Sequence, residues 1–158
     1  MHKAIHYLSV LIVCYVPYAY SEGVEDLSKE TRILLRSEMS AIATGMNNLF
    51  AAYYSGDFKE VSRIAKNIED SFILKKEMTQ GQRHEIHTVL PKGFLRRDKQ
   101  FHYNAGMLAH VAEKGKDELV GFYFSELAKG CIGCHSEYAK DRFGHLVKPK
   151  KEVEEHHH

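Results

Sequence analysis

Apolar side chains recur at helical spacing along most of this chain. In residues 25–55, where no proline occurs, they are spaced alternately by four and three residues: Leu35, Met39, Ile42, Met46, Leu49 and Tyr53. Residues 58–72 repeat the pattern: Phe58, Val61, Ala65, Ile68 and Phe72. Stripes of this kind are typical of helices that bury one face in a bundle.

Two further helices are predicted in the second half of the chain. One covers residues 98–114, and the last carries a stripe with the same alternation: Val120, Phe124, Leu127, Cys131, Cys134 and Tyr138. The triplets SGD at 55–57 and GKD at 115–117 each combine a helix stop with a new N-cap.

Helical periodicity fails between residues 77 and 97, a stretch with two glycines and one proline, which therefore predicts a long crossover loop. No convincing alternating strand pattern occurs anywhere. The expected fold is all-α, an antiparallel up-down four-helix bundle with a long loop between helices 2 and 3.

The first 21 residues differ from the rest of the chain. A weakly basic start (His2 and Lys3) precedes an apolar run over residues 7–16, and small residues stand two apart at Ala19 and Ser21. This order predicts a secretory signal peptide over residues 1–21, cut after Ser21, with an uncleaved anchor as the alternative. The run is short for a membrane span, so we expect a periplasmic protein without stable membrane insertion after cleavage. Residues 22–150 would form the domain, and 151–158 a charged tail that could include a tag remnant.

Signal cleavage would remove one of the 22 basic residues and none of the 21 acidic ones, leaving a mature net charge of zero. A nucleic-acid partner is not expected, because such a partner requires a concentrated basic face. Cleavage also removes Cys14, so Cys131 and Cys134 would enter an oxidising compartment with no other thiol to pair with.

The sequence GCIGCHSEY at 130–138 carries the candidate chemistry. On a helix, Cys131 and Cys134 point the same way, and His135 follows directly. C-x-x-C-H is a c-type haem attachment signature, in which both thiols bind haem covalently and the histidine ligates the iron. Zinc bound with the help of His84 and His87, or a redox pair, are the alternatives. A disulfide three residues apart within a helix would have poor geometry. We therefore expect one covalent haem c.

The layout resembles the cytochrome c′ family, the class II c-type cytochromes, in its helix stripes and its CxxCH followed by an aromatic residue, Tyr138. This resemblance implies a four-helix bundle with haem near the end of the last helix and a distal residue from the first helix. That residue is either a Met that ligates iron or an apolar side chain that leaves it five-coordinate. The arginine that usually follows the aromatic residue is replaced by Ala139, with Lys140 and Arg142 beyond.

Met39 is the expected distal ligand. It lies 17 residues before Gly56, and Cys134 lies 18 residues after Lys116, so both should lie about 25 Å from the same end of the bundle. If Met39 only packs over the haem, the iron would be open to small gases. His102 is the second candidate ligand, with a surface or pocket-edge position as the alternative.

The function expected from these features is that of a periplasmic monohaem cytochrome, a one-electron carrier and not an enzyme, with redox proteins as partners. The alternatives are a five-coordinate protein that binds NO or CO, and a zinc-stabilised bundle. Arg36, one turn before Met39, could pair with a haem propionate. Leu34 and Phe50 lie outside the main stripe and could support a homodimer or pack sideways within one chain.

Overall fold

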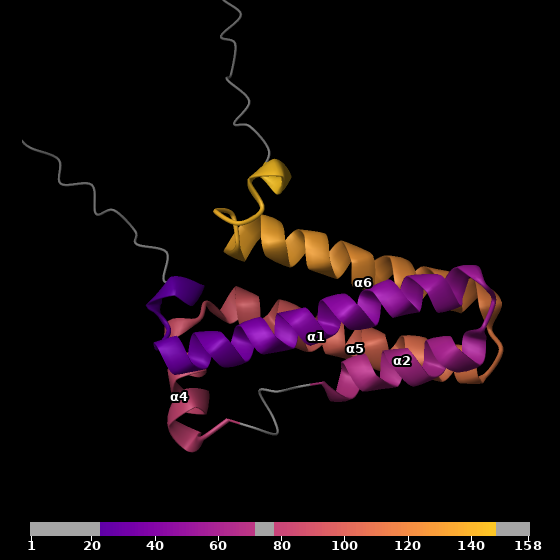
Figure 1. The fold of residues 1–158 in the computed structure, drawn as a ribbon, viewed down its shortest axis with the longest axis horizontal. Coiled ribbons are helices and arrows are strands. Elements are labelled where there is room, and N and C mark those ends of the chain that lie inside the picture. Colours follow the sequence, from indigo (N-terminus) through magenta and orange to yellow (C-terminus); the bar gives the residue numbers. More distant parts are fainter. Residues whose placement is uncertain (1–22, 72–77, 148–158) are drawn as a thin grey trace, which may run out of the picture.

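The computed structural model describes residues 23–71 and 78–147 (Figure 1). The predicted signal peptide and the charged tail lie outside these residues. Within the described ranges the regular structure is helical and no strand occurs. The helices are η1 (Val24–Asp26), α1 (Lys29–Tyr54), α2 (Phe58–Asp70), α4 (Gln80–Val89), α5 (Lys92–Glu113), α6 (Asp117–Tyr138) and η2 (Gly144–Leu146). The all-α prediction is confirmed, and no helix in the described ranges is long and apolar enough to cross a membrane.

The predicted ends of the first helix, and the start of the second at Phe58, are confirmed to within a few residues. Ser28 caps α1 by accepting a hydrogen bond from the backbone N–H of Thr31. The chain leaves α1 through Gly56, whose φ of 73° lies in the left-handed region that favours glycine. Asp57 then caps α2 through the N–H of Glu60. These contacts explain the abrupt turn between α1 and α2.

The second turn follows the prediction only in part. Gly115 has a φ of 63°, as expected of a residue that ends a helix. The N-cap of α6 is Lys116, however, and it makes no side-chain cap hydrogen bond; Asp117 is the first helical residue. Its carboxylate, together with Glu118, lies in the first turn of α6, where the helix dipole favours negative charge.

Adjacent helices pack against each other in the order α1, α2, α5 and α6. Helix α2 contacts both α1 and α5, and α5 contacts α6 along its length (Figure 1). The main core is formed between these helices by apolar side chains: Leu49, Ala52, Val61, Ile64, Ala65, Ile68, Ala105, Leu108, Ala109, Val111, Ala112, Val120 and Leu127. Burial of this apolar surface is the dominant favourable contribution to folding.

The prediction of a long loop over residues 77–97 is wrong for most of its length. Helix α4 begins after Thr79, which forms a capping box with Gln82, and α5 begins directly after Pro91 rather than at residue 98. The pattern was hidden because only Ile86 of α4 is buried, so no stripe is visible in the sequence.

Helix α4 belongs to a second, smaller core at the end of the molecule away from the two glycine turns (Figure 1). Ile86 and Leu90 pack there with Leu27, Leu35, Met78 and Phe94. The carboxylate of Glu85 accepts hydrogen bonds from the hydroxyl of Thr31 at 2.5 Å and from Ser28. These contacts attach α4 to the first turn of α1.

Candidate functional site

The CxxCH sequence occupies the last turns of α6 and is positioned by packing against α5. Gly130 brings α6 close to α5, since a methyl group on it would lie 3.2 Å from the ring of Phe101. One turn beyond His135, the ring of Tyr138 packs edge-on against Phe94, with centroids 5.5 Å apart. The α5-facing side of α6 also carries Cys134, which packs against the small core around Phe94, whereas Cys131 and His135 lie further around the helix.

Cys131 and Cys134 are half-buried free thiols. Burial raises the pKa of both, and that of Cys134 reaches about 11, to which the charge of Asp98 contributes after burial. Cys131 and Cys134 thus differ in the direction of the pKa shift from reactive redox cysteines, whose thiol pKa values are lowered. They are protonated thiols held three residues apart on one helix.

His135 is half-buried beside them. Its imidazole stacks on the ring of Phe143, with centroids 4.1 Å apart and planes inclined by 2°. Burial lowers the pKa of His135, and the positive charge of Arg142 lowers it further. The imidazole is therefore neutral at pH 7, which is the form that binds metal ions.

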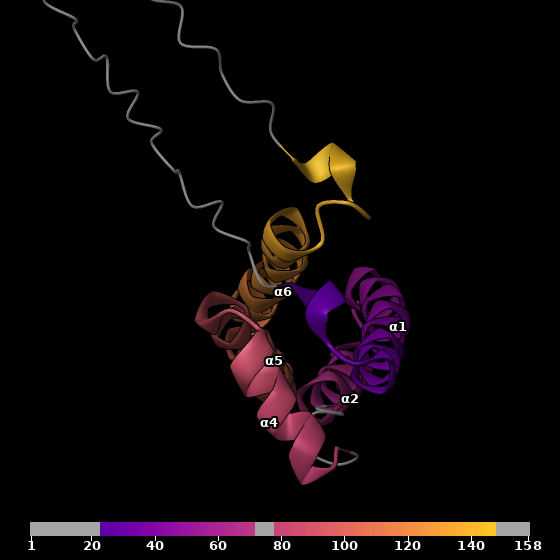
Figure 2. The ribbon, with the colours of Figure 1, turned by 90° about the vertical axis from the view of Figure 1, so that its left-hand side faces the viewer.

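Helices α1 and α6 meet near the glycine turns. The ring of Tyr53 stacks on Phe124 with centroids 4.7 Å apart and planes inclined by 11°, and Phe50 lies 6.5 Å from the same ring. Phe50, 54% exposed, thus packs sideways within its own chain. Toward the other end of the molecule the two helices diverge (Figures 1 and 2).

These contacts identify the side of each helix that faces the other. At about 100° per residue, Cys131 and His135 lie within about 20° of Phe124 around the axis of α6. Met39 lies within about 20° of Phe50 around α1 by the same rule. His135 and Met39 are therefore on the facing sides of the two helices. Met39 is 37% exposed.

The stripe predicted for α1 is correct for Leu35, Ile42 and Leu49, which are buried. It is wrong for Met39, which is not in the interior. Glu38, with 0% exposure, takes the interior position that the stripe assigned to Met39. Helix α1 has two adjacent faces: one faces α2 and α5 and holds Glu38, and the other faces α6 and holds Met39.

A buried polar cluster lies beside the candidate site, and sequence reasoning missed most of it. His102, 2% exposed, is neither a surface nor a pocket-edge residue. Its Nδ1 lies 2.9 Å from the carbonyl oxygen of Ile68; since a carbonyl only accepts, Nδ1 carries a proton. Its Nε2 faces carboxylate oxygens of Glu38 at 3.6 Å and Asp98 at 3.7 Å.

This cluster needs at least one further proton, on Nε2 or on a carboxyl group, because a bare Nε2 lone pair would repel both carboxylates. Burial raises the pKa of Asp98 to about 6. Glu38 could have been found from its place between Leu35 and Ile42 at helical spacing. Asp98 shows no such signal, because polar residues near helix ends are usually solvated.

The remaining predicted residues are not brought together. His84 and His87 are exposed on α4. No group of three or more His, Cys, Asp or Glu side chains in residues 23–71 and 78–147 could hold a metal ion, so the proposed zinc set with Cys131 and Cys134 is not assembled. Arg36 is exposed on α1, and its pairing with a propionate stays a prediction.

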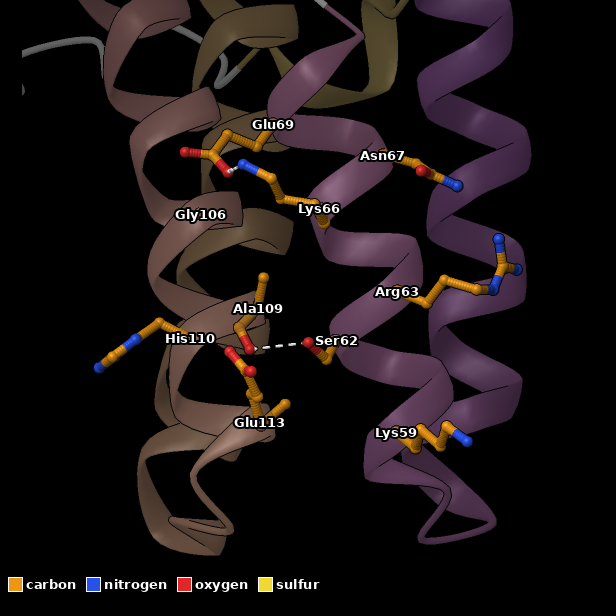
Figure 3. A pocket seen from close by; sticks show the side chains of 11 residues that line it. Lys59, Ser62, Arg63, Lys66, Asn67, Glu69, Gly106, Ala109, His110 and Glu113 are labelled. Carbon is orange, nitrogen blue, oxygen red and sulfur yellow. Dashed lines mark hydrogen bonds and ion pairs between the residues drawn. The ribbon is translucent and has the colours of Figure 1, made fainter.

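An open groove of about 740 Å³ lies away from these residues, between α2 and α5 (Figure 3). Two of its cations are paired with carboxylates on their own helix: Arg63 with Glu60 at 2.5 Å and Lys66 with Glu69 at 2.6 Å. The hydroxyl of Ser62 donates to the carbonyl of Ala109 across the groove. Its polar groups do not converge on a point, as those of a binding site do.

Comparison with known proteins adds no further guide to the site: no protein family, curated protein or solved structure matches this chain.

Proposed function

We propose that the chain is an exported c-type monohaem cytochrome that carries single electrons between redox proteins. The observation that carries the proposal is the donor set on the last turns of α6: two protonated thiols, Cys131 and Cys134, followed by the neutral imidazole of His135. This set fits a haem held by two thioether bonds and one axial nitrogen. In this proposal α1, α2, α5 and α6 form an antiparallel four-helix bundle as the scaffold.

Haem, when bound, supplies the one-electron chemistry of its iron. The chain's own residues would attach and orient it. Cys131 and Cys134 would anchor it to α6, and His135 of α6 and Met39 of α1 would supply a nitrogen and a thioether sulfur to its iron. Arg36, one turn before Met39, would pair with a propionate. A histidine–methionine pair would raise the reduction potential of the iron and leave it closed to substrates, which suits electron transfer.

A five-coordinate protein that binds NO or CO is the second candidate, and one observation favours it. Met39 is 37% exposed, whereas Glu38 next to it is fully buried. The Met39 side chain is therefore only partly enclosed by its neighbours. If Met39 remained a lid, the distal position would stay open to small gases.

The test is the optical spectrum of the exported protein, oxidised and reduced, with and without CO. Met39 ligation predicts a sharp low-spin spectrum that CO leaves unchanged, and Met39→Ala should abolish the weak methionine–iron charge-transfer band. Met46→Ala is the matched control, since Met46 lies on the same side of α1 two turns further on. A high-spin spectrum that shifts with CO would refute ligation and support gas binding. Absence of haem from cells competent for cytochrome c maturation would refute both.

A further inference from the structure

The contact between His135 and Phe143 is made by the segment that follows α6. Helix α6 ends at Tyr138, and the backbone N–H of Phe143 donates to the carbonyl of Ala139 at 3.0 Å. This turn folds the chain back, so that Phe143 covers one face of the His135 ring. The guanidinium carbon of Arg142 lies 6.0 Å from the centroid of the Phe143 ring.

The geometry of this contact leaves His135 able to bind a metal. The two rings are parallel to within 2°, so Phe143 covers the face of the imidazole rather than its edge. Both imidazole nitrogens direct their lone pair or hydrogen outward in the ring plane. A metal ion therefore approaches along the edge, which this stack does not cover.

A stacked ring also restricts rotation of the imidazole about its bond to Cβ. Rotation of the His135 ring away from the parallel arrangement would break a contact with centroids 4.1 Å apart. The direction in which the ligating nitrogen points is thus set by a residue that itself carries no ligating atom. In metal sites, residues around a histidine ligand commonly fix its ring orientation in this way.

We propose that Phe143 is a positioning residue for His135: its ring holds the imidazole in the orientation required of the proximal iron ligand. The inference rests on the proposed function, because it assigns Phe143 a role toward the same haem. Its effect should be largest on the retention of His135 by iron, because a free imidazole must be re-oriented before it can bind again.

The experiment uses the full exported chain with haem attached. Acid titration of the ferric protein, followed by its Soret band, measures the pH at which His135 leaves the iron. Phe143→Ala and Phe143→Leu should raise the midpoint by about 0.3 to 1 pH unit, the two- to tenfold effect of one stacked aromatic pair. Phe143→Tyr, which keeps a flat ring, should match the parent protein. Val147→Ala is the control, because it trims an exposed apolar residue of the same segment.

Two further measurements separate positioning from loss of structure. Far-UV circular dichroism at each pH should show unchanged helix content, and the electron paramagnetic resonance g values of the ferric iron should move in Phe143→Ala but not in Val147→Ala. If haem attaches and the midpoints and g values of all four variants coincide, the inference is overturned while the proposed function stands. If the parent chain takes up no haem under maturation conditions, both fall.

Discussion

The carboxyl group of Asp98 allows the buried cluster to be tested through the stability of the protein. Burial raises its pKa from 3.8 to about 6. Between these values the folded chain holds a proton that the unfolded chain releases. The free energy of unfolding contributed by Asp98 is therefore fully present below about pH 4 and is lost as the pH rises through about 6. Asparagine does not ionise, so Asp98→Asn should not show this loss of stability as the pH rises.

The magnitude follows from the size of the shift. Each pKa unit corresponds to about 1.4 kcal/mol. Relative to that of Asp98→Asn, the free energy of unfolding of the parent protein should therefore be about 3 kcal/mol lower at pH 7 than it is well below pH 4. The side chain of Asp98 is only 13% exposed, so little of this is screened by solvent. The asparagine side chain has nearly the same shape, which keeps packing changes small.

The assay is urea unfolding of the haem-free chain at several pH values between 4 and 7, for the parent protein and Asp98→Asn. The difference between their free energies of unfolding should grow in favour of the variant as the pH rises. Asp70→Asn is the control, because the side chain of Asp70 is 53% exposed and its difference should be small at every pH.

An opposite slope would refute this reasoning. If the parent protein gained stability over Asp98→Asn as the pH rose, the carboxylate would be stabilised by a protonated His102, whose Nε2 lies 3.7 Å away. A difference that did not change with pH would mean that Asp98 is solvated in solution, contrary to its position beside Cys134.

Three further predictions concern the scaffold. Glu38→Ala should lower the free energy of unfolding by about 1–3 kcal/mol in urea titrations, because it leaves the buried His102 without the carboxylate that faces its Nε2 at 3.6 Å; no loss would show that the two side chains are not buried together in solution. Gly56→Ala should cost about 1 kcal/mol in the same assay, since its φ of 73° is unfavourable for an L residue, and no change would place that turn in another conformation. Thr31→Val removes the hydroxyl that donates to Glu85, so amide hydrogen exchange in α4 should become faster while that in α2 does not; equal protection of α4 would argue that other contacts hold it.

Several features were predictable from the sequence because they depend on residues close together in the chain. A helix repeats every 3.6 residues, so the stripes from Leu35 to Leu49 and from Val120 to Tyr138 predict helices without knowledge of their neighbours. Gly56 and Gly115 end helices through their own backbone conformation. The common direction of Cys131 and Cys134 follows from their spacing of three residues within one helix.

Other features were decided only by the tertiary structure. Glu38 and Met39 are neighbours in the sequence, and which of them is buried depends on where α2, α5 and α6 lie around α1. His102 is buried because α5 turns it toward Ile68 and Glu38, residues 34 and 64 positions away in the chain. The stack of Phe143 on His135 requires the chain to turn back after α6. A local period shows that a helix has a buried face, but the placement of the other helices determines which residues meet there.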